Sequence, residues 1–151
     1  MLSDEQATID VINSFVEIGI EDLSEGKPCF INFTESLLAK GIHTYFDPET
    51  IVIEVLETAQ YTDEFIDVLR KLKDDGYRIA LDDFELVGNE PYFDAVLNLA
   101  DIVKVDIQKT SWDKQNKILP LLKKYGVQLL AEKVETREEY EQCLKYGYTL
   151  F

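Results

Sequence analysis

Carboxylates gather where short apolar segments of this 151-residue chain end. Five successive segments, each interpreted as a strand, become polar at their carboxyl ends. The carboxyl ends of parallel strands meet at one rim of a barrel or one edge of a sheet, so these side chains are predicted to surround one mouth. The strand-end residues are Asn32, Glu54, Glu57, Asp82, Asp83, Lys104, Asp106, Glu132 and Glu135.

Like charges this close are unfavourable unless a cation neutralises them or the carboxyl pKa values rise. Carboxylate and amide oxygens suit Mg²⁺, Mn²⁺ or Ca²⁺, and no histidine or cysteine is placed to favour zinc. Two such ions could clamp a phosphodiester and activate a water, with Lys104 orienting that water or balancing phosphate charge. A single acid at a strand end is explained by a role as a helix cap or loop residue. That explanation accounts poorly for polar residues at the ends of five successive strands. Asp83 and Glu57 could be supports rather than ligands, and Asp106 and Glu135 could be partners of ligands or surface groups.

The elements that position these residues alternate along the chain. Strands separated by amphipathic helices at this spacing predict parallel strands with right-handed crossovers, an α/β fold. Pro120 is expected to kink or split the helix that contains it. Strands are predicted over 29–33, 51–56, 77–81, 101–107, 128–134 and 148–151, and helices over 5–20, 35–40, 63–75, 91–99, 114–125 and 137–146.

Composition restricts the classes of function. A net charge of −15, from 15 basic and 30 acidic residues, argues against binding a nucleic acid polymer. No apolar run approaches the ~18 residues of a membrane span, and the first residues do not read as a signal peptide. Cys29 and Cys143 fit no metal or redox spacing, which favours free buried thiols in the cytoplasm. The length predicts one domain over residues 1–151, well short of the ~250 residues of a full (β/α)₈ barrel.

Other residues are predicted to be structural. His43 lies in a polar loop and is expected to be solvated. Trp112 with Tyr125 is expected to pack between helices rather than to stack on a base. Neither GxGxxG nor GxxxxGK[ST] occurs, so the glycine-rich cradles of dinucleotide and P-loop sites are missing.

In order and spacing, the strand-end motifs resemble the EAL domain, a family of bacterial cyclic di-GMP phosphodiesterases. The resemblance runs from about Ile9 to Phe151. The sequence is most similar to the EAL half of EAL–HDOD signalling proteins. It implies a modified TIM barrel, Mg²⁺ or Mn²⁺ as cofactor, cyclic di-GMP as ligand and an HDOD-type partner domain. The motifs are FINFT, IVIEVLE, IALDDF, DIVKVDI and AEKVET.

The resemblance also implies roles for single residues. Lys104 matches the lysine that acts on the catalytic water, and Glu57 the glutamate that steadies the active-site loop. Asp106 and Glu135 match supporting acids. The metal ligands would be Asn32, Glu54, Asp82, Asp83 and Glu132.

Departures from the family pattern separate two hypotheses. Glu85 and Lys133 stand where the family usually has glycine, and the Glu-Ala-Leu strand and the Gln-Gly-Tyr segment have no counterpart. These departures favour a degenerate or inactive domain that acts in nucleotide sensing or protein interaction. The alternative is an active phosphodiesterase that hydrolyses cyclic di-GMP to linear pGpG. A barrel lacking its first strand and last units would also expose sheet edges, which predicts a homo-oligomer.

Overall fold

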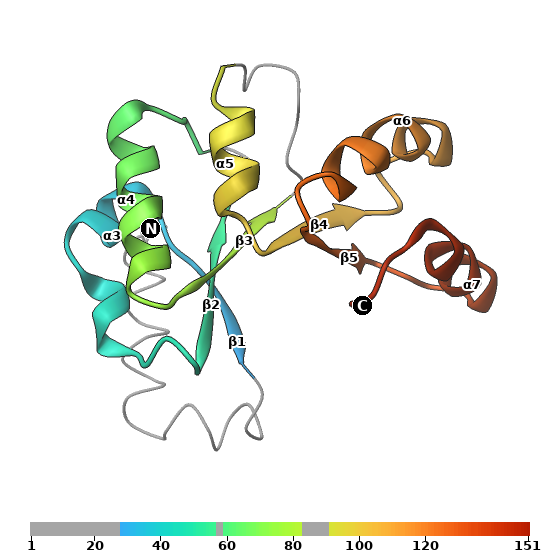
Figure 1. Ribbon diagram of the computed structural model, residues 1–151. Coiled ribbons are helices and arrows are strands. Elements are labelled where there is room, and N and C mark those ends of the chain that lie inside the picture. Colours follow the sequence, from blue (N-terminus) through green and yellow to red (C-terminus); the bar gives the residue numbers. More distant parts are fainter. Residues whose placement is uncertain (1–27, 57–58, 83–90) are drawn as a thin grey trace, which may run out of the picture. The chain divides into compact units, whose positions relative to one another are not determined.

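A computed structural model describes residues 28–56, 59–82 and 91–151, in which strands and helices alternate (Figure 1). The helix predicted over 5–20 lies outside these residues. The elements are β1 (Cys29–Asn32), α3 (Glu35–Ala39), η1 (Ile42–Tyr45), β2 (Ile51–Val55), α4 (Asp63–Asp74), β3 (Arg78–Asp82), α5 (Phe93–Leu99), β4 (Ile102–Asp106), α6 (Trp112–Lys123), β5 (Gln128–Glu132) and α7 (Arg137–Tyr146).

The strands form one five-stranded parallel sheet in the order β1-β2-β3-β4-β5. Sequential parallel neighbours joined by helical crossovers confirm the predicted α/β class. All five residues of β2 are buried, as expected for a strand covered on both faces. The sheet therefore brings the carboxyl ends of successive strands to one edge.

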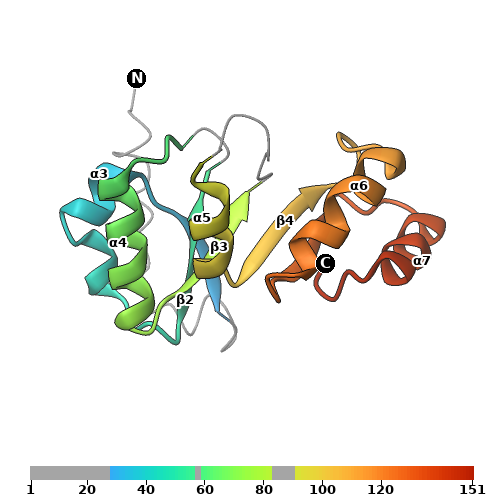
Figure 2. The ribbon, with the colours of Figure 1, turned by 45° about the horizontal axis from the view of Figure 1, so that its top comes forward.

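The described residues belong to two compact units, Met1–Ile79 and Ala80–Phe151. In the first unit, α4 presents Phe65, Leu69 and Leu72 to the core at helical spacing. In the second, α6 contributes Leu119 and Leu122 to a core that also contains β4 and β5 (Figure 2). Each unit thus supports its own strand ends with its own apolar core.

Helix ends follow the capping residues of the sequence. Thr62 accepts from the backbone amide of Phe65, and Thr136 and Glu139 form the predicted capping box of α7. Helix α6 begins at Trp112, two residues before the predicted start, because Ser111 caps it. The helix continues through Pro120, so the prediction of a split is wrong, and the alternative of a kink stays a prediction. Proline removes one backbone hydrogen bond there, and the buried side chains on either side hold the helix together.

The predictions about two ring side chains, His43 and Trp112, have different outcomes. His43 is buried rather than solvated, with its ring 5.2 Å from that of Tyr77 and 6.4 Å from that of Phe33. The Trp112 ring on α6 lies 5.0 Å from the Tyr146 ring on α7, which confirms its predicted packing between helices. The Tyr125 hydroxyl donates to Asp94. These contacts join segments distant in sequence, which local patterns do not reveal.

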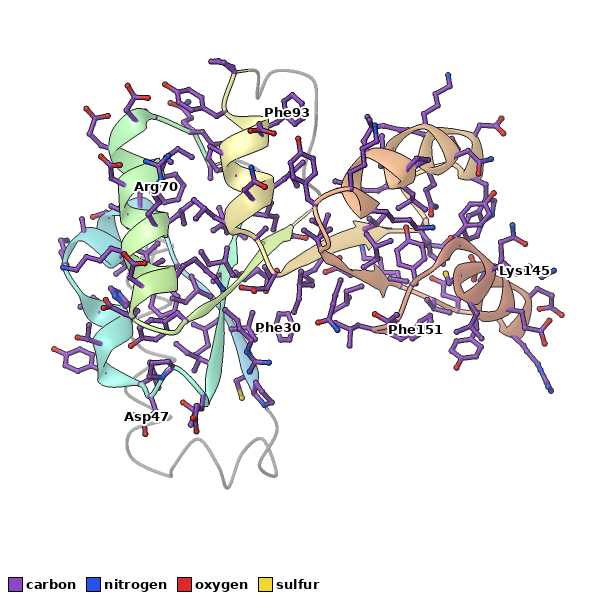
Figure 3. The ribbon with its side chains drawn as sticks, viewed as in Figure 1. Phe30, Asp47, Arg70, Phe93, Lys145 and Phe151 are labelled. Carbon is purple, nitrogen blue, oxygen red and sulfur yellow. The ribbon has the colours of Figure 1, made fainter. Side chains whose placement is uncertain are left out.

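The last residues extend the sheet by a single contact. Leu150 makes a parallel bridge to Leu130, consistent with the predicted strand over 148–151. The Phe151 ring, labelled in Figure 3, lies 4.7 Å from that of Tyr140. Both cysteines are free thiols, with Cys143 fully buried. None of the helices described by the structure is both long and apolar enough to cross a membrane.

Candidate metal centre

In the first unit, two predicted ligands end neighbouring strands. Asn32 ends β1 and pairs in register with Glu54, the fourth residue of β2. Register partners of parallel strands project from the same face of the sheet, so this pair shares a face. Glu54 is buried, and Asn32 is exposed at the strand end.

The second unit also contains predicted site residues that are register partners on neighbouring strands. Asp82 at the end of β3 is the register partner of Lys104 on β4, and Asp106 is the partner of Glu132 on β5. Lys104 and Asp106 are two residues apart, so both point to one face of β4. Four predicted site residues therefore gather at the carboxyl ends of β3, β4 and β5.

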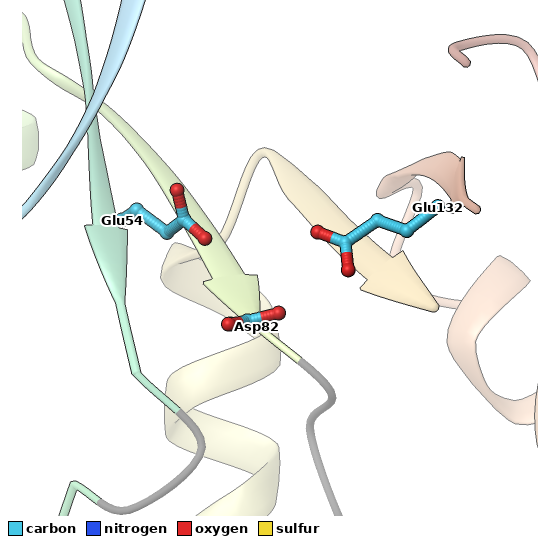
Figure 4. A group of neighbouring side chains, drawn as sticks. All are labelled: Glu54, Asp82 and Glu132. Atoms are coloured by element: carbon cyan, nitrogen blue, oxygen red, sulfur yellow. The ribbon is translucent and has the colours of Figure 1, made fainter. Parts of the chain in front are cut away.

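Two carboxylates of this unit approach each other closely. Asp82 and Glu132 each offer a carboxylate oxygen, and these oxygens lie within 4.8 Å of each other. Figure 4 draws both side chains, together with Glu54 at the end of β2. Two oxygens at 2.3–2.6 Å from one Ca²⁺ ion are separated by up to about 5 Å, so this spacing suits a shared cation of that class. The donor set is entirely oxygen, as the hard divalent ions require.

Lys104 contacts one carboxylate of this pair, that of Glu132, directly. Its Nζ lies 2.7 Å from Glu132 Oε1, and only 14% of the Lys104 side chain and 24% of the Glu132 side chain are exposed. A charge-assisted contact in a partly buried position fixes both side chains. The lysine that the sequence analysis singled out therefore contacts one of the predicted metal ligands, and its role in catalysis stays a prediction.

Asp106 has a different environment from Asp82 and Glu132. Its Oδ1 accepts from the backbone amides of Gln108 and Lys109, and its Oδ2 lies 2.9 Å from Lys133 Nζ. Burial alone raises the pKa of Asp106, but the Lys133 contact and the two amides outweigh burial and leave the pKa below its ordinary value. Asp106 is therefore an ionised carboxylate whose oxygens are engaged by the chain itself.

The contact to Lys133 was missed by sequence reasoning. Lys133 has φ of +61°, the left-handed region that favours glycine, and no other non-glycine residue in the described ranges has a positive φ. This conformation accounts for the glycine that the family pattern places here. The sequence could have drawn attention to Lys133 because a lysine stands at a glycine position of the family pattern. The contact with Asp106 depends on the fold.

For Glu135, Glu57 and Asp83, the structure describes no contact with the candidate metal centre. Glu135 is exposed, and its backbone amide donates to Glu139 in the α7 capping box. Glu57 and Asp83 lie outside the described residues, as does Glu85. Their predicted roles stay predictions.

The pattern of strand ends now has a counterpart among known families. The model of the EAL domain matches residues 2–151. The chain belongs to the EAL domain family. The resemblance drawn from the strand-end motifs is confirmed, and so is the relation to a TIM-barrel type of fold.

Individual relatives agree with this assignment. The chain is 45% identical over 150 residues to the uncharacterized protein YuxH of Bacillus subtilis and 33% identical over 143 residues to the cyclic di-GMP phosphodiesterase CdgJ of Vibrio cholerae. The matches cover 97% and 93% of the chain but only 37% and 32% of those proteins. The chain thus spans about a third of the length of the curated relatives it matches.

A solved structure has the same fold. The YkuI protein of Bacillus subtilis, which has an EAL domain and was solved in complex with substrate c-di-GMP and calcium, matches with a TM-score of 0.71 at 20% identity. The match covers 97% of the chain and 41% of that protein. At this identity the likeness extends to the fold alone.

Proposed function

We propose that this EAL domain binds a divalent cation and cyclic di-GMP at the carboxyl ends of its strands, and acts in signal transduction as a nucleotide-sensing module. The observation that carries the proposal is that carboxylate oxygens of Asp82 and Glu132 lie within 4.8 Å of each other and that Glu132 contacts Lys104. The phosphodiester groups of a cyclic dinucleotide are anionic, so an acidic rim can hold them only with a cation between.

The proposed ligand set extends beyond this pair. Glu54 and Asn32 are proposed as further ligands from their positions in the sequence, and within their own unit they are register partners with oxygen donors. Asp83 is proposed as a further ligand on its sequence position alone. All are oxygen donors, which supports Mg²⁺ or Mn²⁺, and calcium is named in the complex of YkuI.

The remaining residues have supporting roles in the proposal. Lys104 would orient Glu132 and balance charge on a bound phosphate, and Glu57 would steady the neighbouring loop. When bound, a divalent cation of this class polarises a phosphoryl oxygen and lowers the pKa of its water. Asp106 would support the centre through its contacts rather than as a ligand.

Sensing is favoured over turnover by two residues at glycine positions of the family pattern. Glu85 follows the Asp82–Asp83 pair in the sequence and adds a charge and a side chain at a position where the family pattern has glycine. Lys133 directly follows Glu132 and holds a backbone conformation that L residues rarely adopt. The second candidate function is hydrolysis of cyclic di-GMP to linear pGpG, which the contact of Lys104 with Glu132 and the name of the relative CdgJ favour.

Two measurements on the purified chain test the proposal. Calorimetry with cyclic di-GMP should detect binding with Mn²⁺ and much weaker binding with the chelator EDTA. Chromatography of the same mixture at high protein concentration should detect no pGpG, and release of pGpG would select the phosphodiesterase instead. Absence of binding at any concentration would leave only a role as a protein-interaction scaffold.

Further proposals concern the whole protein and its surroundings. An HDOD-type partner domain, a cytoplasmic location and self-association are proposed from the sequence. The single bridge between Leu130 and Leu150 leaves most of this edge of β5 without a described strand partner. Light scattering at increasing concentration tests self-association, and a constant monomer mass would contradict it.

A further inference from the structure

We propose that Lys133 is a positioning residue for the metal centre, and that its pairing with Asp106 holds Glu132 in place. The proposal deepens the proposed function, because Glu132 matters as a ligand only if the centre binds a cation. It assigns a function to the lysine that replaces glycine in this chain.

The backbone at Lys133 is the first observation. Its φ of +61° is disfavoured for a residue with a Cβ, so other contacts must stabilise the turn. Lys133 directly follows Glu132, the last residue of β5. The conformation of Lys133 therefore sets the direction in which the chain leaves the strand at the candidate ligand.

The side chain of Lys133 provides one such contact. Its Nζ lies 2.9 Å from Oδ2 of Asp106, whose side chain is only 3% exposed. Two backbone amides donate to the other oxygen of Asp106, which fixes the carboxylate at the end of β4. The ammonium is therefore tied to a rigid acceptor.

The backbone carbonyls of Lys133 and Glu132 make the other contacts that stabilise this conformation. The Gln108 side-chain amide donates to the Lys133 carbonyl at 3.0 Å and to Glu139 at 2.7 Å. The backbone amide of Ile107 donates to the Glu132 carbonyl at 3.3 Å. The last residue of β4 thus holds the Lys133 side chain, and the two residues after β4 hold the carbonyls of Lys133 and Glu132.

These contacts have a consequence for metal binding. To share a cation with Asp82, the Glu132 carboxylate must point toward that cation and lie at bonding distance from it. We infer that the backbone conformation of Lys133 determines this orientation. Residues that orient a metal ligand commonly change affinity by 10- to 100-fold when they are replaced. Loss of the pair should weaken cation binding while the carboxylate ligands themselves stay unchanged.

A charge-balanced double variant tests this inference. D106N/K133M removes one negative and one positive charge, so the net charge of the chain is unchanged. The new amide oxygen in D106N can still accept the two backbone amides, and methionine keeps a similar length to lysine. We expect at least tenfold weaker Mn²⁺ binding by calorimetry than in the wild type. The control R137M/E141Q removes the exposed pair on α7, whose atoms are 3.3 Å apart, and should leave Mn²⁺ affinity unchanged.

A second readout needs no metal. Hydrogen exchange of the Ile107 amide, measured with EDTA, should become at least tenfold faster in D106N/K133M, because its acceptor on Glu132 is less firmly held. The conservative variant K133R should retain both slow exchange and Mn²⁺ affinity. Unchanged exchange and unchanged affinity in a folded D106N/K133M chain would overturn the inference. If the wild type binds no Mn²⁺, the proposed centre fails, and the Ile107 exchange alone still decides the role of Lys133.

Discussion

The ammonium of Lys104 lies 2.7 Å from Oε1 of Glu132, and both side chains are largely shielded from water. The pair joins β4 to β5 across the face that carries the strand-end acids. A divalent cation and this ammonium would both neutralise Glu132, so their effects on stability are expected to overlap.

Replacing Lys104 by methionine should make stability depend on metal. Without metal, K104M leaves the Glu132 carboxylate without this cationic partner, and we expect a loss of about 1–3 kcal/mol in the free energy of unfolding. Saturating Mn²⁺ should stabilise K104M more than the wild type, because the ion takes over the neutralisation. Urea unfolding with and without Mn²⁺ measures both. K145M, at an exposed position on α7, is the control, and equal stabilisation of K104M and the wild type would contradict the prediction.

Replacing Asp82 by asparagine should weaken metal binding far more than stability. The variant keeps the shape of the side chain but loses one charged ligand oxygen next to Glu132. We expect at least tenfold weaker Mn²⁺ binding, about 1.4 kcal/mol, by calorimetry. The matched control D67N removes an exposed carboxylate that pairs with Arg70 on α4. If D82N and D67N bind Mn²⁺ equally well, Asp82 is not a ligand.

Acidification should destabilise the first unit through His43. The pKa of His43 is lowered, chiefly by burial. The charge of Asp75 raises this pKa in part, and the charge of Lys71 lowers it further. The Nδ1 atom of His43 has no described hydrogen-bond partner. The folded state therefore favours neutral histidine, and the unfolded state binds more protons. This contribution is fully present above the unfolded pKa of about 6.5 and is lost as pH falls below it. Urea unfolding at pH 7.5 and 5.5 measures the loss, and H43F should lose less stability over this interval. Equal losses in H43F and the wild type would count against the assignment.

Removing the Tyr148 hydroxyl should destabilise the second unit. The hydroxyl donates to Oε1 of Gln115 at 2.7 Å, and both residues are buried. Y148F would leave a buried amide oxygen without this donor, which costs about 1–3 kcal/mol of unfolding free energy. Y45F, at a tyrosine that is 69% exposed, is the control and should change stability little. A Y148F chain as stable as Y45F would show that the contact contributes nothing.

Local patterns predicted the fold of this chain well. Strand β2 is apolar except for Glu54. Phe65, Leu69 and Leu72 recur at helical spacing, and Thr62 and Thr136 are caps. Each of these features is a property of a few consecutive residues. Such features depend on backbone geometry and burial of one face, so the sequence states them directly. Acids at strand ends then follow from parallel topology, which accounts for the correct placement of Asp82 and Glu132.

The errors and omissions concern contacts between distant segments. His43 stands in a polar stretch, and only the packing of Phe33 and Tyr77 around it excludes water. Asp106 was expected to support a ligand or to lie at the surface, and nothing in the sequence indicated that Lys133 would lie 2.9 Å from its second oxygen.

The sequence by itself therefore determined the family, the order of parallel strands and the residue types at their ends, because periodicity and motif spacing are encoded in the chain's linear order. The tertiary structure alone decided which carboxylates approach each other and which are engaged by the chain's own cations. Those outcomes depend on the register of β3, β4 and β5 and on one left-handed turn, and distances of a few ångströms between such segments are set by packing.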